Sequence, residues 1–268
     1  MNFIALDYLD ILLASLTIAV NAGLSIAMRL GLGQRLVIAA LRMVVQLTLV
    51  GLVLKALFSV ASPVLTGFTI LIMILFAGRE AMARQHRRFH GWWSYGLGTG
   101  SMMTAGVIVL IFGLTTQISP DPWYDPRYAI PLMGMILGNT MNGVSIGLDR
   151  MIAGVVDRRA AIEARLCLGA EAKEAFRPVV SDALRAAFIP TINGMSAAGI
   201  VSLPGMMTGQ ILAGADPVEA VKYQIIIMFL IAGGTGIGSF AAVYFARQRL
   251  TDSRHRLRLD RLTPVKGL

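Results

Sequence analysis

The sequence predicts an all-α, polytopic membrane protein with about seven transmembrane helices. Of its 268 residues, 56% are hydrophobic and only 15% are charged, whereas a soluble domain is nearer half apolar and a quarter charged. The charges also separate long apolar runs from one another. Because about 20 helical residues cross a hydrocarbon core of about 30 Å, each of these runs is long enough for one span.

Seven segments meet this criterion in chain order. They are residues 11–28, 36–58, 56–78, 91–120, 128–148, 186–215 and 223–246. All are free of charged residues except the second, which contains Arg42 and Lys55. The first has no basic segment before it and no cleavage pattern after it, so we interpret it as a retained span and not as a signal peptide.

The distribution of Lys and Arg predicts the orientation, because these residues stay on the cytoplasmic side of a membrane. Nearly all of the 24 lie in the links after spans one, three and five, or in the tail. The exceptions are Lys55, Arg127 and Lys222 on the opposite side and Arg42 within a span. We therefore expect a multi-pass protein of the cell inner membrane, with its N-terminus outside and its C-terminus in the cytoplasm.

The short links leave no room for a soluble domain. We expect residues 1–248 to form a single transmembrane domain and residues 249–268 a basic cytoplasmic tail that lies against anionic membrane lipids. The net charge of +9 then marks the inner face, and no nucleic-acid partner is expected. The single cysteine, Cys167, lies on the reducing side and forms neither a disulfide nor a metal cluster.

The sequence lacks the residues expected for hydrolysing ATP itself and for transport driven by protons or sodium. It has no Gly-x4-Gly-Lys-[Ser/Thr] loop to hold phosphates, so the chain is expected to be no enzyme and to bind no cofactor. Glu80 and Asp149 fall at span ends, and the three histidines fall in cytoplasmic segments. Because carriers driven by protons or sodium commonly place a carboxylate inside the membrane, we expect the energy to come from another chain.

Residues 159–177, between spans five and six, are charged but favour a helix. They contain no Pro and a single Gly, and small and apolar residues at helical spacing form a stripe. The stripe consists of Ala161, Ala164, Leu168, Ala172, Ala175 and Val179. Gly169 indicates a bend or a close approach, and Pro178 is expected to end or kink the helix. The stripe alone is equally typical of a helix lying among lipid head groups.

The stretch "EARLCLG" in this segment resembles the cytoplasmic coupling loop of ABC-transporter permeases. In that loop Glu-Ala-Ala, three residues and Gly form a short helix that docks into an ATPase subunit. Glu163, Ala164 and Gly169 match the spacing, whereas Arg165 replaces the second Ala. The resemblance implies that Glu163, Ala164, Arg165, Gly169 and Glu171 couple this chain to an ATPase.

Two longer stretches resemble the bacterial iron-export ABC-transporter permease family, to which plant aluminium-tolerance permeases are similar. They are "GNTMNGVSIGLDRM" (138–151) and "IPTINGMSAAGIVSLPGMMTGQILAG" (189–214). The resemblance extends from the first span to about Gln248. It implies a permease paired with a second copy, a separate cytoplasmic ATPase that binds ATP and Mg, and export of iron or a related metal ion.

Span five carries small and polar residues along one face: Pro131, Gly134, Gly138, Asn142 and Ser145, with Asn139 and Met141 alongside. Helix packing explains the pairs Gly134/Gly138 and Gly143/Gly147, and likewise Gly234/Gly238 in span seven. Two neighbouring Asn amides are costly to bury without partners. We therefore predict a water-lined path along Asn139, Met141, Asn142 and Ser145, with interhelical hydrogen bonding as the alternative.

The run 186–215 is too irregular for one straight helix, because it contains Pro190 and the breaking triplet Leu203-Pro204-Gly205. Irregular backbone at membrane depth is tolerated where it lines a cavity. The candidate path residues here are Pro204, Met206, Met207, Thr208 and Gln210. Met206 and Met207 are candidate ligands for a soft metal, or else they fill gaps between helices.

Arg42 and Gln46 lie one turn apart in span two. Arg42 either reaches back to the membrane surface or lines a cytoplasm-facing vestibule together with Gln46. Two other functions compete with an ATP-driven permease. One is a self-sufficient channel or secondary carrier, whose charged loop merely rests on lipid, and the other is a scaffold or sensor that transports nothing.

Overall fold

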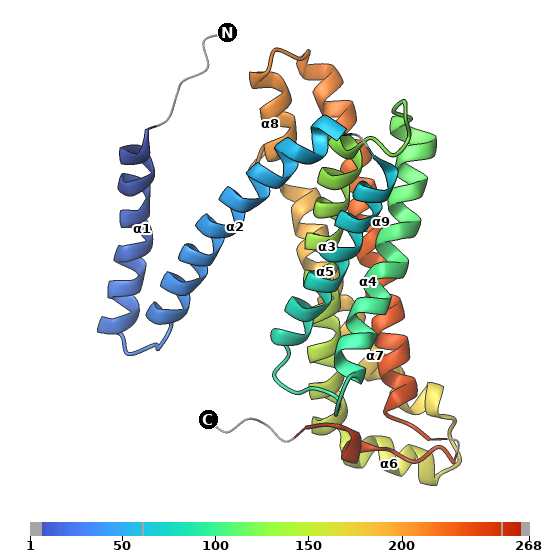
Figure 1. Cartoon of the computed structure of the whole chain (residues 1–268). Helices are drawn as coiled ribbons and strands as arrows, with labels where there is room; N and C mark the ends of the chain where they lie inside the picture. The colour runs from blue at the N-terminus through green and yellow to red at the C-terminus, as the bar shows by residue number, and fades with distance from the viewer. Residues whose placement is uncertain (1–6, 61, 253, 264–268) are drawn as a thin grey trace. The chain divides into compact units, whose positions relative to one another are not determined.

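The computed structural model describes residues 7–60, 62–252 and 254–263. Across these residues the regular structure is helical, with isolated β-bridges only (Figure 1), so the all-α prediction is confirmed. The helices are α1 (Tyr8–Ala27), α2 (Gly33–Val60), α3 (Pro63–Ala83), α4 (Trp93–Phe112), α5 (Pro126–Asp157), α6 (Arg159–Cys167), α7 (Ala172–Ala197), α8 (Gly205–Leu212) and α9 (Pro217–Arg249). A π-helical turn, Gly113–Ile118, extends α4, and a 3-10 turn, Leu259–Arg261, lies in the tail.

Five helical segments of the described chain are long and apolar enough to cross a membrane. They are Leu9–Ala27, Gly33–Val60, Pro63–Ala83, Trp93–Ile118 and Pro217–Arg249. Helices α5 and α7 have 32 and 26 residues, which is enough length at about 1.5 Å per residue, but their polar residues make them less apolar. The protein is therefore a helical membrane protein, and the count of seven spans and their orientation stay predictions.

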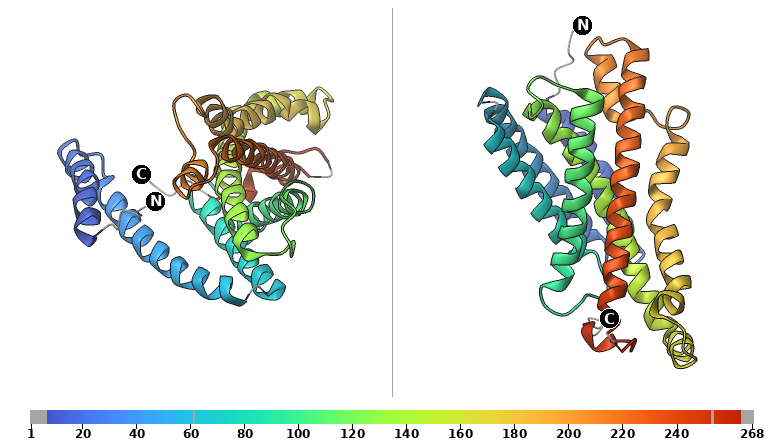
Figure 2. Two further views of the ribbon diagram at one scale, coloured as in Figure 1. Left: turned by 90° about the horizontal axis from the view of Figure 1, so that it is seen from above. Right: turned by 90° about the vertical axis from the view of Figure 1, so that its right-hand side faces the viewer.

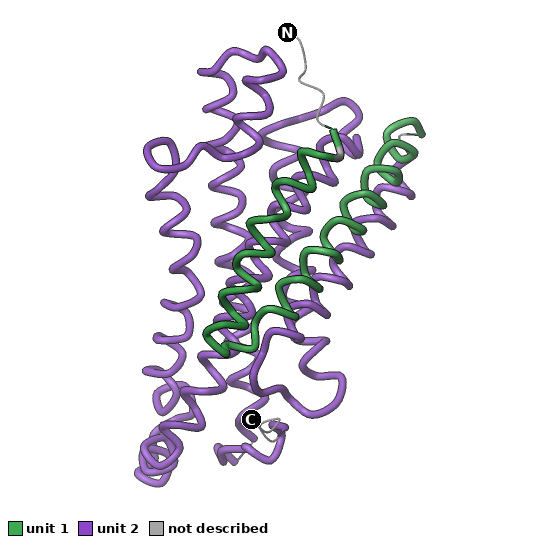
Figure 3. The backbone as a smooth tube through the Cα atoms, turned by 90° about the vertical axis from the view of Figure 1, so that its left-hand side faces the viewer, with its two compact units in different colours: residues 1–61 green, residues 62–268 purple. Residues whose placement is uncertain are grey.

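The chain forms two compact units, residues 1–61 and 62–268 (Figure 3). In the first unit α1 and α2 pack against each other across a short turn in which Arg29 and Gly31 have positive φ. The Ser25 hydroxyl oxygen accepts a hydrogen bond from the Leu32 N–H at 3.0 Å and closes this turn. Close packing continues at Gly33, where a Cβ would lie 3.1 Å from the Ala22 carbonyl oxygen.

Helix α5 is the centre of the second unit and packs against α9, α7, α3 and α4 (Figure 2). Its contact with α9 depends on glycines. A Cβ on Gly143 would lie 2.6 Å from Thr235 Cγ2, and one on Gly234 would lie 2.8 Å from Ile136 Cγ2. The pairs Gly143/Gly147 and Gly234/Gly238 therefore serve close helix packing, as predicted.

The prediction of one continuous helix over residues 159–177 is wrong. Helix α6 ends at Cys167, and the chain turns before α7 begins at Ala172. Gly169 has φ +90°, the Ala170 N–H donates to the Arg165 carbonyl and the Gly169 N–H donates to the Leu166 carbonyl. These are the bonds of a left-handed glycine cap, so Gly169 ends α6. The apolar stripe is broken here, because Leu168 is 87% exposed.

Of the two outcomes predicted for Pro178, an end or a kink, the structure rules out the end, because α7 continues through both Pro178 and Pro190 to Ala197. Neighbouring helices support the backbone at such sites in helical bundles, and the α7 residues Val179, Ala183 and Ala187 are buried. The expected break in the run 186–215 is confirmed. It spans residues 198–204 and includes Gly199 at φ +86°.

The tail folds back onto the loop that joins α3 to α4. Leu262 forms an antiparallel bridge with Phe89, and the Thr263 N–H donates to the Arg88 carbonyl at 2.8 Å. Phe89, Leu250 and Leu262 are buried in this contact region. Residues 250–252 and 254–263 thus belong to the second unit and pack against it through Leu250 and Leu262.

Ion pairs join Asp252 and Asp260 to arginines within the described tail. The Asp252 carboxylate accepts hydrogen bonds from the backbone N–H and the guanidinium of Arg256, and these bonds lower the pKa of Asp252 to about 2. Arg258 donates to both oxygens of Asp260 at 2.9 and 2.8 Å, which lowers the pKa of Asp260 to about 2. Both carboxylates are therefore ionised at neutral pH and engaged by tail arginines.

Candidate functional site

One face of α5 is left open within the second unit. It carries Pro131, Gly138 and Asn139, which are exposed, and the half-buried Asn142. We call these four residues the open face of α5. A Cβ on Gly138 would meet no atom within 4 Å, so the pair Gly134/Gly138 does not serve close packing here. That part of the packing prediction is not confirmed.

Asn142 on the open face is held by a residue from α3's end. Arg84 Nη1 donates a hydrogen bond to Asn142 Oδ1 at 2.7 Å. The two residues line a cavity of about 190 Å³ together with Ser145, Ile146 and Asp149. The hydrogen bond of Asn139 differs, because its Nδ2 donates to the Met135 carbonyl of its own helix at 2.9 Å.

A second contact forms two turns further along α5. The His86 N–H donates to Asp149 Oδ1 at 3.0 Å, and the His86 ring Nδ1 lies 3.1 Å from the same oxygen. Asp149 also borders a second cavity of about 220 Å³, lined in part by His86, Arg87 and Asp157. We call Arg84, His86, Asn142 and Asp149 the α3–α5 clamp, because two residues after α3 grip two residues of α5.

The other predicted residues of α5 lie inside the fold. The Ser145 side chain is buried and its hydroxyl donates to the Met141 carbonyl at 2.6 Å. Met141 packs against the hydrophobic core. Of the four predicted path residues on α5, the structure thus places Asn139 and Asn142 on the open face and Ser145 beside the cavity.

The predicted residues after the chain break lie on the short helix α8, which packs against α9. Met206 packs at the edge of the core and Met207 is buried. Adjacent residues of a helix do not share a face, so the two thioethers point in different directions. Within the described residues no group of three His, Cys, Asp or Glu side chains is placed to hold a metal ion.

Two glutamines at α8 and the start of α9 have buried side-chain oxygens. The sequence predicted a role for Gln210 but not for Gln224. Gln210 Oε1 on α8 and Gln224 Oε1 on α9 are buried without a hydrogen-bond partner in the described chain. Thr208 instead donates to the Pro204 carbonyl at 3.2 Å. Buried unpaired amides are costly, so this end of the second unit favours a polar ligand or water. Gln224 was missed because it sits in an otherwise apolar run.

The predicted path residues therefore fall into three groups. One is on α5, one on α8, and Arg42 and Gln46 lie on α2 in the first unit. Part of the α3–α5 clamp was missed from the sequence, because Arg84 and His86 were assigned only to a basic cytoplasmic link between two spans. No local signal pairs Arg84 with Asn142, since 58 residues separate them.

The predicted coupling residues form an exposed hairpin on an anchored base. Ile162 of α6 is buried, and an ion pair of 2.8 Å joins Arg158 to Asp182 of α7. Glu163 accepts a hydrogen bond from Arg159 Nε at 2.8 Å. The residues that remain exposed are Ala164, Arg165, Leu168, Gly169 and Glu171. Because α6 is joined to α5 by Arg158 alone, a force on this hairpin would reach α5 and α7 directly.

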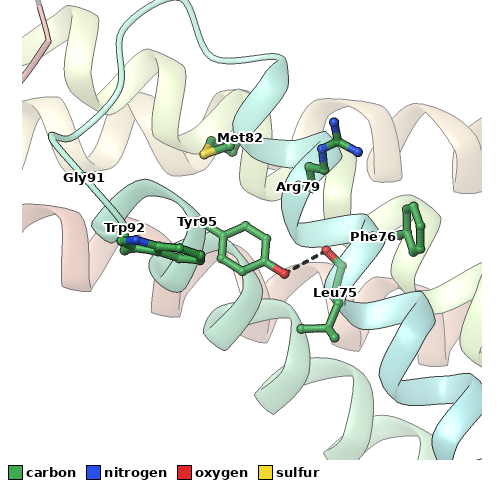
Figure 4. Close-up of a pocket in the computed structure, with 7 residues that line it drawn as sticks. All are labelled: Leu75, Phe76, Arg79, Met82, Gly91, Trp92 and Tyr95. Atoms are coloured by element: carbon green, nitrogen blue, oxygen red, sulfur yellow. Dashed lines mark hydrogen bonds between the residues drawn. The ribbon is translucent and has the colours of Figure 1, made fainter.

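Two grooves flank the start of α4. The α3/α4 groove encloses about 580 Å³ and is lined by Leu75, Phe76, Arg79, Met82, Gly91, Trp92 and Tyr95 (Figure 4). The Tyr95 hydroxyl donates to the Leu75 carbonyl at 3.2 Å across this groove (Figure 4). The α4/α9 groove is larger, about 810 Å³, and contains Arg249 and Arg261. Neither groove includes a predicted path residue.

These features define an all-helical, multi-pass membrane protein with an anchored polar hairpin at one end. The chain belongs to the uncharacterised protein family UPF0014, whose model matches residues 8–251. It is 41% identical over 205 residues to the UPF0014 membrane protein slr1647 of Synechocystis, covering 75% of this chain and 77% of that protein.

Two further relatives carry functional names. The chain is 34% identical over 223 residues to the "Probable iron export permease protein FetB" of Escherichia coli, covering 82% of this chain and 83% of that protein. It is 29% identical over 223 residues to "Protein ALUMINUM SENSITIVE 3" of Arabidopsis thaliana, covering 82% and 79%. No solved structure matches this chain.

Proposed function

We propose that this chain is the membrane-spanning permease subunit of an ABC transporter that exports iron or a related metal species. ATP is hydrolysed on a separate cytoplasmic ATPase chain, and two permease copies form the path. The observation that carries the proposal is the exposed hairpin of α6 and Gly169 on a base anchored to both α5 and α7. The name of the Escherichia coli relative supports the export of iron.

In this mechanism the hairpin receives the motion of the ATPase. Leu168 and Arg165 project from it and insert between ATPase surfaces, and the buried Ile162 transmits the displacement to the bundle. As α5 and α7 move, the α3–α5 clamp opens and releases Asn142. The path then runs along Asn139 and Asn142 toward the break before α8.

The same hairpin supplies the test. Leu168 is 87% exposed, so Leu168→Asp removes no packing contact in this chain. We expect this variant to insert and fold normally but to lose metal-stimulated ATP hydrolysis when co-purified with the ATPase. The matched control is Leu212→Asp on α8, the same change at a 64% exposed leucine at the opposite end of the second unit (Figure 1).

Two outcomes would contradict the proposal. One is full ATPase stimulation and metal efflux in the Leu168→Asp variant. The other is metal flux through the purified chain alone in proteoliposomes without ATP, which would identify a self-sufficient channel or carrier. Unchanged metal tolerance in cells that lack the chain would instead favour a scaffold or sensor.

A further inference from the structure

We infer that the groove between α4 and α9 is a binding site for one anionic phospholipid. Its phosphate lies beside Arg249 and Arg261, and one of its acyl chains runs along α4. The inference is independent of transport, because it requires only that α4 and α9 cross a membrane.

Positive charge gathers at one end of the groove, where Arg249 interacts electrostatically with Arg261, with Arg258 and with one carboxylate, Asp260. Arg249 Nε is buried and has no hydrogen-bond partner in the described part of the chain, while the guanidinium carbon lies 4.4 Å from the centroid of the Trp93 ring. Arg261 Nη1 donates to the carbonyls of Arg249 and Thr251 at 2.7 and 3.3 Å. A guanidinium has five N–H donors, so both side chains retain donors for an anion.

The two carboxylates of the described tail are already engaged by other arginines. Asp260 is held by Arg258 through two hydrogen bonds, and Asp252 is held by Arg256. One further unpaired buried group lines the groove, the Ser101 hydroxyl on α4. A phosphate is an acceptor for guanidinium donors, and it would satisfy Arg249 Nε. Ser101 lies eight residues along α4 from Trp93, about 12 Å at 1.5 Å per residue, and therefore faces the part of the groove beyond the phosphate.

The rest of the groove has the length and chemistry of an acyl-chain site. On α4 it runs from Trp93 to Thr104, which is about 16 Å at 1.5 Å per residue and close to half of a hydrocarbon core of about 30 Å. Gly96 and Gly100 form its floor, because a Cβ at either position would meet no atom within 4 Å. Leu97 and Phe245 contribute apolar surface.

The surroundings favour a lipid over a soluble anion. Trp92 and Trp93 stand at the mouth, and tryptophans gather at the membrane–water boundary. The charged donors are confined to the end where α9 finishes at Arg249, and the walls beyond them are mainly apolar, with the hydroxyls of Ser101 and Thr104 as polar groups. The neighbouring α3/α4 groove shares Trp92 but has Arg79 as its single arginine (Figure 4).

Tryptophan quenching by brominated lipids tests the site. The full chain carries three Trp residues, and Trp123→Phe leaves Trp92 and Trp93, the two in the groove, as reporters. This protein is placed in phosphatidylcholine vesicles that contain a small fraction of phosphatidylglycerol, with bromine on either lipid. We expect brominated phosphatidylglycerol to quench about 25-fold more per molecule, because each arginine beside anionic lipid contributes about a fivefold preference.

Three variants in this background separate charge from shape. Arg249→Gln should lower the preference about fivefold, whereas Arg247→Gln, the same change two residues away and outside the groove, should leave it intact. Gly100→Leu should block quenching by either lipid, because the new side chain extends into the groove from a position where an added Cβ meets no atom within 4 Å. Gly67→Leu, an equally open glycine on α3, is its control.

Each alternative result overturns the inference. Equal quenching by the two brominated lipids would show an ordinary lipid contact and not a specific site. Displacement of phosphatidylglycerol by millimolar inorganic phosphate would assign the arginines to a soluble phosphate. Loss of preference in Arg247→Gln as well as Arg249→Gln would show a diffuse basic surface, and a folded Gly100→Leu variant with unchanged quenching would remove the groove from the account.

Discussion

Two faces of the same helix, α5, carry glycines at the same spacing but differ in what meets them. On the packed face Gly143 faces Thr235, Ser239 and the Ala187 carbonyl, all within 3.4 Å of where a Cβ would be. On the open face Gly138 meets nothing within 4 Å. A glycine pair four residues apart therefore permits close approach of another helix without requiring it. Whether a helix packs there depends on the residues that the partner helix offers, which are small at Gly143.

The difference separates the two roles of α5. Buried small polar residues, Thr140, Thr235 and Ser239, lie in the α5/α9 contact and are each 0% exposed, so the packed face holds the second unit together. The open face carries Asn139 and Asn142 and is free within the unit, which suits a surface that meets a substrate path or a second copy.

Gly143→Leu has the largest expected effect. The new side chain would overlap Thr235 and Ser239, and overpacking of this kind costs typically about 1–3 kcal/mol and occasionally more. We expect a lower midpoint of thermal unfolding and a lower yield of monodisperse protein, measured by heating followed by size-exclusion chromatography. A midpoint equal to that of the native chain would contradict the close packing of α5 on α9.

Gly138→Leu sharpens the comparison from the other side. The Cβ added by the same substitution five residues earlier meets no atom within 4 Å, so the free energy of unfolding should change by no more than about 0.5 kcal/mol. Metal efflux with the ATPase should nevertheless fall, because the leucine projects from the open face. A loss of thermal stability as large as that of Gly143→Leu would show that this face is packed too.

Arg84→Gln is expected to have only a small effect on stability. Its hydrogen bond to Asn142 is partly exposed, since the Arg84 side chain is 44% exposed, and such contacts contribute about 1 kcal/mol or less. We expect a small stability change and an altered rate of coupled ATP hydrolysis, because the α3–α5 clamp no longer holds Asn142. Arg150→Gln, also on α5, is the control, and equal rates in both variants would remove the clamp from the mechanism.

The sequence was a good guide to elements and a poor guide to pairings. Apolar runs separated by charge predicted the helices, and Leu203-Pro204-Gly205 predicted the break that the chain makes before α8. From the sequence, Gly169 was consistent with a bend in a helix or with a helix end. A glycine directly after the last apolar residues of a helix is typical of a helix end, which is what the structure has. Pro178 does not end α7, and the buried neighbours Val179 and Ala183 support the helix there.

The site was predictable only where its residues are neighbours in sequence. Asn139 and Asn142 were predicted to share one helix face because they are close together in sequence, and the structure places both on the open face of α5. The sequence did not predict that their hydrogen bonds differ, because Asn142 is bound by Arg84, which lies at the end of another helix. Likewise, the buried Gln224 acceptor and the arginines of the α4/α9 groove became visible only once α9 and the tail were placed beside α4.

The bridge between Phe89 and Leu262 has a practical consequence for anyone who engineers this chain. Truncating the chain after residue 249 would expose Phe89, which is 3% exposed in the folded chain. It would also remove the hydrogen-bond partners of the Arg88 carbonyl and the His90 N–H. Reporters or purification tags should therefore be fused after the last residue. A fusion that replaces the tail would disturb the loop between α3 and α4, and the loss of function could be mistaken for a transport defect.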